Sequence, residues 1–159
     1  MYPNIPEEAV PVILTPPVTT NGGVTTDYIS LKNAHRVFVV CVMKQAATHA
    51  TGIDPVQATL VDGTGAKAIT NTVPIWKNAD ISATSVMTRQ TDAITANATA
   101  GTTDKVITFD INPAKLDVEN AFDVLGFTVD DSSEATNFIS IVAYVIPRYA
   151  SPAPNFIVD

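Results

Sequence analysis

The sequence predicts an all-β protein: a single-domain β-sandwich or jelly-roll-like barrel with extended arms at both ends. Residues 34–44 and 137–148 are dense in β-branched and aromatic side chains, which favours central strands that are buried on at least one face. Short candidate strands separated by turn signals follow along the rest of the chain. The hydrophobic content of 46% lies largely in Ala and Val interleaved with Thr, and this bias favours pleated strands.

Residues 1–23 are predicted to form a proline-punctuated N-terminal arm. Its prolines exclude a helix and restrict residues 10–15 to an edge strand or an extended strap. Apolar residues in an arm with no core of its own suggest docking onto another surface. The alternative is that Val12, Ile13 and Leu14 form the first strand of the sandwich, and the two interpretations are compatible.

Residues 24–147 are the expected sandwich domain, which opens with a segment at 25–31. Alternation and β-branched enrichment predict strands in it, at 34–44, 57–61, 73–76, 85–88, 93–95, 106–111, 122–129 and 138–146. The Asp-Gly pair at 62–63 is a hairpin turn signal. Residues 90–104 are low in bulky side chains and indicate an exposed loop or a weak edge.

One helix-start signal is present, at Asn112-Pro113, where a cap residue precedes a proline at the first helical position. Strand character resumes at residue 122. We therefore expect at most one short helical turn, near residues 113–117.

Residues 148–159 are predicted to form an extended C-terminal tail. Three prolines within 147–159 keep it extended, while Tyr149, Phe156 and Ile157 are too apolar for a free tail. Such a strap can bury its side chains on a neighbouring subunit. The alternative is a tail that folds back on its own domain.

The composition limits the possible partners. A net charge of -7 with nine basic residues argues against binding to nucleic acid, which needs clustered Lys and Arg. No segment has the ~18–20 apolar residues of a membrane helix, and the N-terminus lacks the pattern of a signal peptide, so we expect no membrane partner. The mean hydropathy of +0.20 is high and indicates apolar surface that is buried against other chains.

The sequence offers little for catalysis, and we expect no enzyme and no cofactor. The two histidines, His35 and His49, lack a second ligand at zinc spacing, and no Gly-x-Ser-x-Gly elbow is present. The acidic turn at 130–134 has no calcium-loop spacing and is best explained as solvated. Cys41 lies inside an apolar run and is expected to be a buried hydrophobe.

Trp76 is the sole tryptophan, and in its apolar context it is expected in the core or at an interface rather than as a sugar-stacking platform. Function is therefore expected in contacts with partners. The predicted interface residues are Val12, Ile13, Leu14, Trp76, Arg148, Tyr149, Phe156 and Ile157.

Several stretches from residue 27 onward carry a family resemblance. They are residues 27–37, 57–59, 63–68, 76–78, 116–118, 122–123 and 147–149. With these patterns of turn and strand, the chain resembles small structural proteins of tailed bacteriophages, encoded in the head gene cluster near the major capsid protein. The proline-rich arm is the least matched region.

The resemblance implies a non-enzymatic virion protein that decorates or cements the capsid by binding the lattice of the major capsid protein. It would be made in the cytoplasm of a bacterial host and reside on the capsid exterior. We expect a homo-oligomer, with a trimer favoured at the threefold positions of the shell. The alternatives are a tail or neck component and, in another class, a carbohydrate-binding β-sandwich that uses Trp76.

Overall fold

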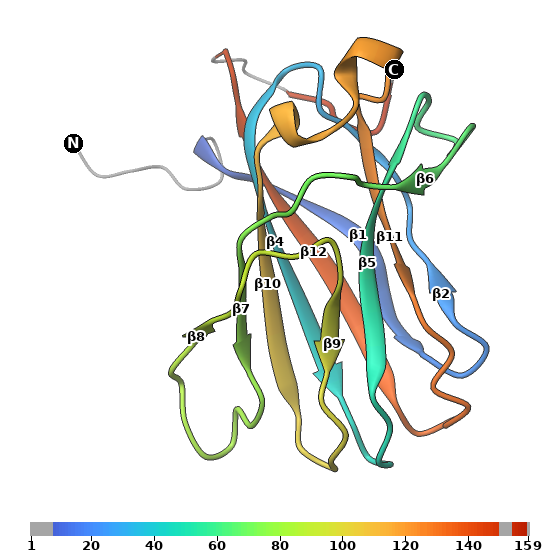
Figure 1. Cartoon of the computed structure of the whole chain (residues 1–159), viewed down its shortest axis with the longest axis vertical. Coiled ribbons are helices and arrows are strands. Elements are labelled where there is room, and N and C mark those ends of the chain that lie inside the picture. The colour runs from blue at the N-terminus through green and yellow to red at the C-terminus, as the bar shows by residue number, and fades with distance from the viewer. Residues whose placement is uncertain (1–7, 150–153, 159) are drawn as a thin grey trace.

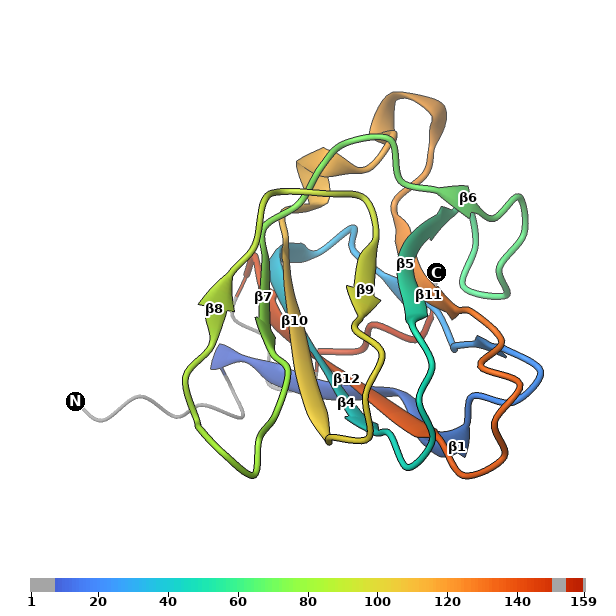
Figure 2. The ribbon, with the colours of Figure 1, turned by 60° about the horizontal axis from the view of Figure 1, so that its bottom comes forward.

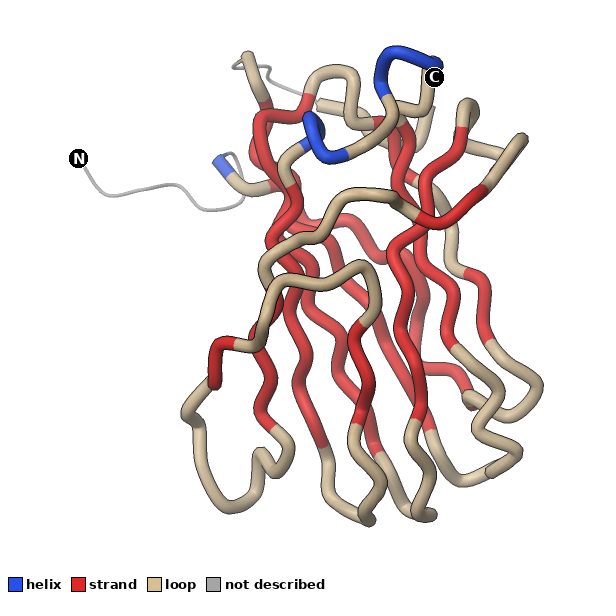
Figure 3. Tube along the Cα trace, viewed as in Figure 1, coloured by secondary structure: helices blue, strands red, loops and turns tan. Residues whose placement is uncertain are grey.

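Two antiparallel sheets packed face to face make up the protein in a computed structural model that describes residues 8–149 and 154–158 (Figure 1). The view in Figure 2 shows the two sheets on either side of the core. Strands dominate the chain, and loops gather at the two ends of the sandwich (Figure 3). The predicted all-β fold is confirmed, and of the two expected architectures it is the β-sandwich.

We call the two layers sheet A and sheet B. Sheet A contains, in spatial order, β1 (Val10–Thr19), β12 (Phe138–Pro147), β4 (Ala34–Lys44), β10 (Lys105–Ile111), β7 (Ile75–Asn78) and β8 (Thr88–Arg89). Sheet B contains, in spatial order, β2 (Val24–Thr25), β11 (Val124–Val129), β5 (Thr51–Ala58) and β6 (Lys67–Ala68), with β3 (Ile29–Ser30) beside β11 and β9 (Ala96–Ala98) beside β5.

Strand β4 lies between β12 and β10, and it spans the same residues, 34–44, that the sequence predicted as a central strand. Its side chains point alternately to the two sides of sheet A because of the pleat. One set is fully buried and faces sheet B, and this set is Val37, Val39, Cys41 and Met43. The neighbouring strands place Ile139, Ile141, Ala143, Val145, Ile107, Phe109 and Ile111 in the same core.

An aromatic contact joins the two sheets. The rings of Phe109 in β10 and Phe127 in β11 lie 5.3 Å apart between centroids, with an interplanar angle of 57°. Both residues are fully buried. Tilted pairs of this kind contribute about 0.5–1.5 kcal/mol beyond the burial of their area, so this pair holds sheet A against sheet B at the middle of the core.

Strand β1 is the edge of sheet A and pairs with β12. An edge strand pairs on one side, so it tolerates the prolines at positions 11, 16 and 17. Leu14 of this strand is 1% exposed and belongs to the core. Residues 10–19 of the predicted arm are thus the first strand of the sandwich, which was one of the two interpretations of this segment.

Strand β5 runs over Thr51–Ala58, whereas the sequence predicted a strand at 57–61. Gly52 and Pro55 obscure it, because both residue types are rare inside strands. A Cβ at Gly52 would lie 2.3 Å from Oδ2 of Asp130, so any larger residue there would displace this carboxylate. The Pro55 carbonyl accepts a hydrogen bond from Ile69 N at 3.3 Å. Because the nitrogen and the carbonyl of one strand residue point to the same edge of the strand, the Pro55 nitrogen also faces this edge of β5.

Along this edge of β5, paired strands lie at both ends, and no paired strand lies opposite the middle. Strand β9 pairs with residues 51–53 and β6 with residues 56–57, and Pro55 lies in the gap, where no N–H is needed. Strand β9 itself falls in the segment 90–104, for which the sequence allowed a loop or a weak edge. Its Ala96 and Ala98 are buried, so this part is an edge strand.

Two short 3-10 turns, η1 (Pro113–Lys115) and η2 (Val118–Asn120), lie between β10 and β11. The predicted cap is confirmed, because the Asn112 side chain accepts a hydrogen bond from Ala114 N at 2.9 Å. The sequence allowed at most one turn near 113–117, and η2 is an addition to it. Within residues 8–149 and 154–158, no helix is long and apolar enough to cross a membrane.

The C-terminal tail returns to its own domain at Phe156. This side chain is 3% exposed and belongs to the core, and its carbonyl accepts a hydrogen bond from Ser30 N at 2.7 Å. The next residue, Ile157, is 61% exposed. Of the two alternatives for the tail, the structure therefore has the folded-back one at this residue.

The anchoring of the tail can be tested with two adjacent substitutions. Phe156→Ala should lower the free energy of unfolding by about 3–5 kcal/mol, because it removes a buried aromatic side chain and leaves a cavity. Ile157→Ala, at an exposed position, should change it by less than about 0.5 kcal/mol. Urea denaturation of both variants measures the difference, and equal stabilities would contradict this placement of Phe156.

Candidate functional site

A row of side chains crosses sheet A on the side that faces away from the core. Residues directly opposite each other in antiparallel strands point to the same side of the sheet. The strand registers align one residue from each of five strands, and this row is Ile13, Val142, Val40, Thr108 and Trp76. Side chains that are far apart in the sequence thus form one line on the solvent side.

Parallel rows on either side extend this surface, which we call the outer face. The neighbouring rows are Pro11–Tyr144–Phe38–Asp110 and Ser140–Val42–Val106–Asn78, and the two ends are Ile146–Arg36 and Phe138–Lys44. The middle of the outer face is therefore occupied by valine, isoleucine and aromatic side chains. Its charged residues, Arg36, Asp110 and Lys44, lie toward the border.

Large apolar side chains on the outer face remain open to solvent. Ile13 is 64% exposed, Val42 is 44% exposed, and Phe38 and Phe138 are each 39% exposed. From strand spacings of about 4.8 Å and about 6.8 Å between same-side residues, the face measures on the order of 500 Å². This footprint includes polar residues such as Thr108 and Asn78, and an exposed apolar patch with a polar rim is a candidate site of interaction.

The corresponding side of sheet B is covered by the protein's own side chains. Gly126 of β11 faces outward, and a Cβ there would lie 2.6 Å from two ring carbons of Tyr28. On the same side, Val56 and Ala58 of β5 and Val124 of β11 are buried. The two sheets therefore differ, because β1, β12 and β4 of sheet A leave Ile13, Phe138, Phe38 and Val42 exposed, while Thr108, Asp110 and Asn78 on the β10 and β7 part of the face are buried.

Polar contacts border the outer face. The guanidinium of Arg36 in β4 donates to both carboxylate oxygens of Asp110 in β10, which raises the pKa of Arg36. At the β8 edge, the guanidinium carbon of Arg89 lies 4.7 Å from the centre of the Trp76 ring. An apolar centre with a polar border is the usual anatomy of a protein–protein interface.

The predicted interface residues fall into two groups. Ile13 and Trp76 lie on the outer face, whereas Val12 points inward against the core and Leu14 belongs to the core, because alternate residues of a strand point to opposite sides. In the tail, Phe156 is a core residue. The remaining predicted residues are exposed, and these are Arg148, Tyr149 and Ile157.

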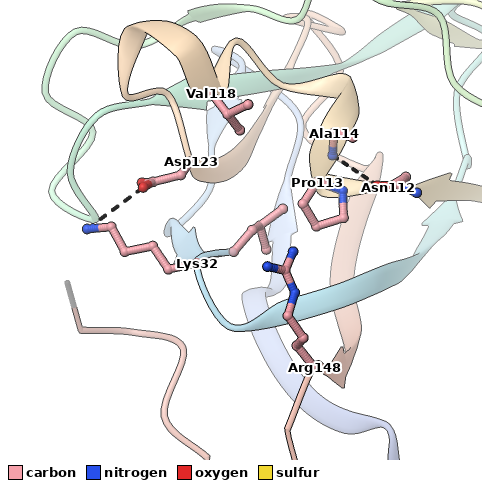
Figure 4. Close-up of a pocket in the computed structure, with 8 residues that line it drawn as sticks. Lys32, Asn112, Pro113, Ala114, Val118, Asp123 and Arg148 are labelled. Atoms are coloured by element: carbon pink, nitrogen blue, oxygen red, sulfur yellow. Dashed lines mark hydrogen bonds and ion pairs between the residues drawn. The ribbon is translucent and has the colours of Figure 1, made fainter.

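A pocket of about 410 Å³ lies at the end of the sandwich that carries η1 and η2 (Figure 4). Leu31, Pro113 and Val118 give it apolar walls, and Arg148 points toward it (Figure 4). Lys32 and Asp123 form an ion pair of 3.9 Å at its side. None of its lining residues is a serine, cysteine or histidine, so the pocket holds no Ser-His or Cys-His pair.

Two polar residues that the sequence analysis considered, Asp131 of the acidic turn and His49, have partners within the protein. The carboxylate of Asp131 accepts hydrogen bonds from Gly22 N at 2.7 Å and Ser133 N at 2.6 Å, which lowers the pKa of Asp131. The His49 ring nitrogen Nδ1 lies 3.3 Å from the Thr51 hydroxyl. Among the described residues, no three His, Cys, Asp or Glu side chains gather in a way that could hold a metal ion.

Cys41 lies in the core between the two sheets and is fully buried. Burial raises the pKa of its thiol above the ordinary value for cysteine, because a thiolate is poorly stabilised away from water. Since the thiolate is the reactive form, this environment is the opposite of the one a nucleophilic cysteine needs. The expectation that Cys41 is a buried hydrophobe is confirmed.

The burial of Cys41 predicts slow labelling by a thiol reagent. In the native protein at pH 8, 5,5′-dithiobis(2-nitrobenzoic acid) should react at the rate at which the sandwich opens, and it should react at once in 6 M guanidinium chloride. The absorbance of the released thionitrobenzoate measures both rates. Rapid labelling under native conditions would contradict the core position of Cys41.

Comparison of the chain with protein-family models, with curated proteins and with solved structures finds no match. The resemblance to phage head proteins therefore stays a prediction from the sequence.

Proposed function

We propose that the protein is a non-enzymatic structural component of a tailed-phage virion, which decorates the capsid from outside by binding the lattice of the major capsid protein. The outer face of sheet A is the observation that carries this proposal. Its rows draw side chains from five strands, and the apolar side chains of Ile13, Phe38, Val42 and Phe138 on it remain exposed. A surface of this kind suits a protein that works by being packed against a partner.

A small contact surface on each copy is sufficient for binding to a shell that repeats the same site many times. Many copies, or several linked protomers, bind at once on a symmetric lattice, so that avidity can exceed the affinity of a single contact by about 10²–10⁴. A homo-oligomer, with a trimer favoured at the threefold positions, would use this effect. The resemblance of residues 27–37 and the later stretches to phage head proteins points to the same role.

The proposal predicts an effect on the stability of heads. Heads prepared without this protein should lose their DNA at a lower temperature and at low salt, and adding back the purified protein should restore stability, because bridging contacts between capsid subunits are recovered. Dye access to the packaged DNA during heating measures the release. Equal stability of the two head preparations would contradict a cementing role.

The same outer face could serve a tail or neck component, which is the alternative function. Gold-labelled antibodies against the protein distinguish the two positions in electron micrographs of whole virions. Label over the head shell supports the proposal, and label confined to the tail or neck overturns it.

A further inference from the structure

Charge is distributed unevenly between the two sheets. Acidic residues outnumber Lys and Arg by 16 to 9 in the whole chain, yet the six strands of sheet A contain a single carboxylate, Asp110. Asp110 is already bonded to Arg36. The cationic residues of the same strands are Arg36, Lys44, Lys77, Arg89 and Lys105.

Most of these cations are engaged within the protein. The ammonium group of Lys105 donates to the Thr103 carbonyl at 2.8 Å, and that of Lys77 donates to the Asn97 carbonyl at 3.2 Å. Arg89 pairs with Asp92. Lys44 differs from them, since it is exposed beside Phe138 at the end of β4 and forms no ion pair within the described residues.

We propose that the outer face binds an apolar protein surface that is bordered by carboxylates, with one of these carboxylates opposite Lys44. The inference rests on the proposed function, in which that surface belongs to the capsid lattice. Complementary charge at the border of an apolar contact favours the correct partner and orientation.

A second copy of the chain fits the outer face less well. Face-to-face pairing would set two surfaces with the same excess of cations against each other, since Asp110 is bonded to Arg36 and Asp104, just before β10, accepts a hydrogen bond from Gln45 N at 3.3 Å.

Binding of the purified protein to heads that lack it, measured by co-sedimentation, tests the inference. Val42→Glu and Ile13→Glu each place a charge in the apolar rows at an exposed position and should weaken binding about tenfold or more. Leu60→Glu is the matched control, because Leu60 is 42% exposed, close to the 44% of Val42, and lies in the turn after β5 of sheet B. It should bind within about twofold of the wild type. Thermal unfolding of each variant verifies the fold.

A charge reversal tests the border. Lys44→Glu should weaken binding about threefold or more at low salt, and the loss should shrink at about 0.5 M NaCl, where charges are screened. Lys32→Glu is the control, since Lys32 is an exposed lysine outside sheet A whose ion pair with Asp123 is long, at 3.9 Å, and thermal unfolding verifies that the loss of this pair leaves the protein folded. Equal effects of the two reversals would overturn the role of Lys44.

The outcomes separate the two proposals. Failure of the wild-type protein to bind heads overturns the proposed function and, with it, this inference. Wild-type binding that Val42→Glu and Ile13→Glu leave intact overturns only the inference. It is also overturned if the free protein sediments as a dimer that Val42→Glu dissociates, or if the protein floats with phosphatidylserine vesicles and Val42→Glu abolishes flotation.

Discussion

Because of the pleat, the central strands of sheet A place apolar side chains on both sides of the sheet, and sheet B covers the inner side. On the inner side, Val39 and Cys41 of β4 meet sheet B across the contact of Phe109 with Phe127. On the outer side, Val40 continues a row of similar composition that faces solvent. Strands that are apolar on both sides are typical of sheets covered on both sides. The fold therefore leaves a surface that another molecule is suited to cover.

The other surfaces are closed by the chain itself. Prolines in β1 remove N–H donors from the strand at the edge of sheet A, which disfavours the addition of a further strand there. Tyr28 lies over Gly126 on the outside of sheet B, and the acidic residues other than Asp110 lie outside the strands of sheet A. Contact through the outer face therefore leaves the pairing of the strands within each sheet undisturbed.

Much of the fold could be predicted from local pattern, and little of the site could. The run at 34–44 and the cap at Asn112 carry their own signals, whereas β5 is hidden by Gly52 and Pro55, whose roles depend on distant neighbours. The outer face depends on the registers of strands that are far apart in the sequence, and no single segment encodes these registers. Ile13 and Trp76 were predicted as interface residues without the row that joins them. Leu14 and Phe156 were predicted there for their apolar character, which serves the core instead.

The structure of the protein bound to a phage head, determined by electron cryomicroscopy, tests the docking role of the outer face most directly. If sheet A docks on the shell, Phe38, Val42 and Val142 should lie in contact with the capsid protein, and a capsid carboxylate should lie near the ammonium group of Lys44. A bound protein whose outer face remains open to solvent, or is covered by a second copy of the chain, would contradict that role.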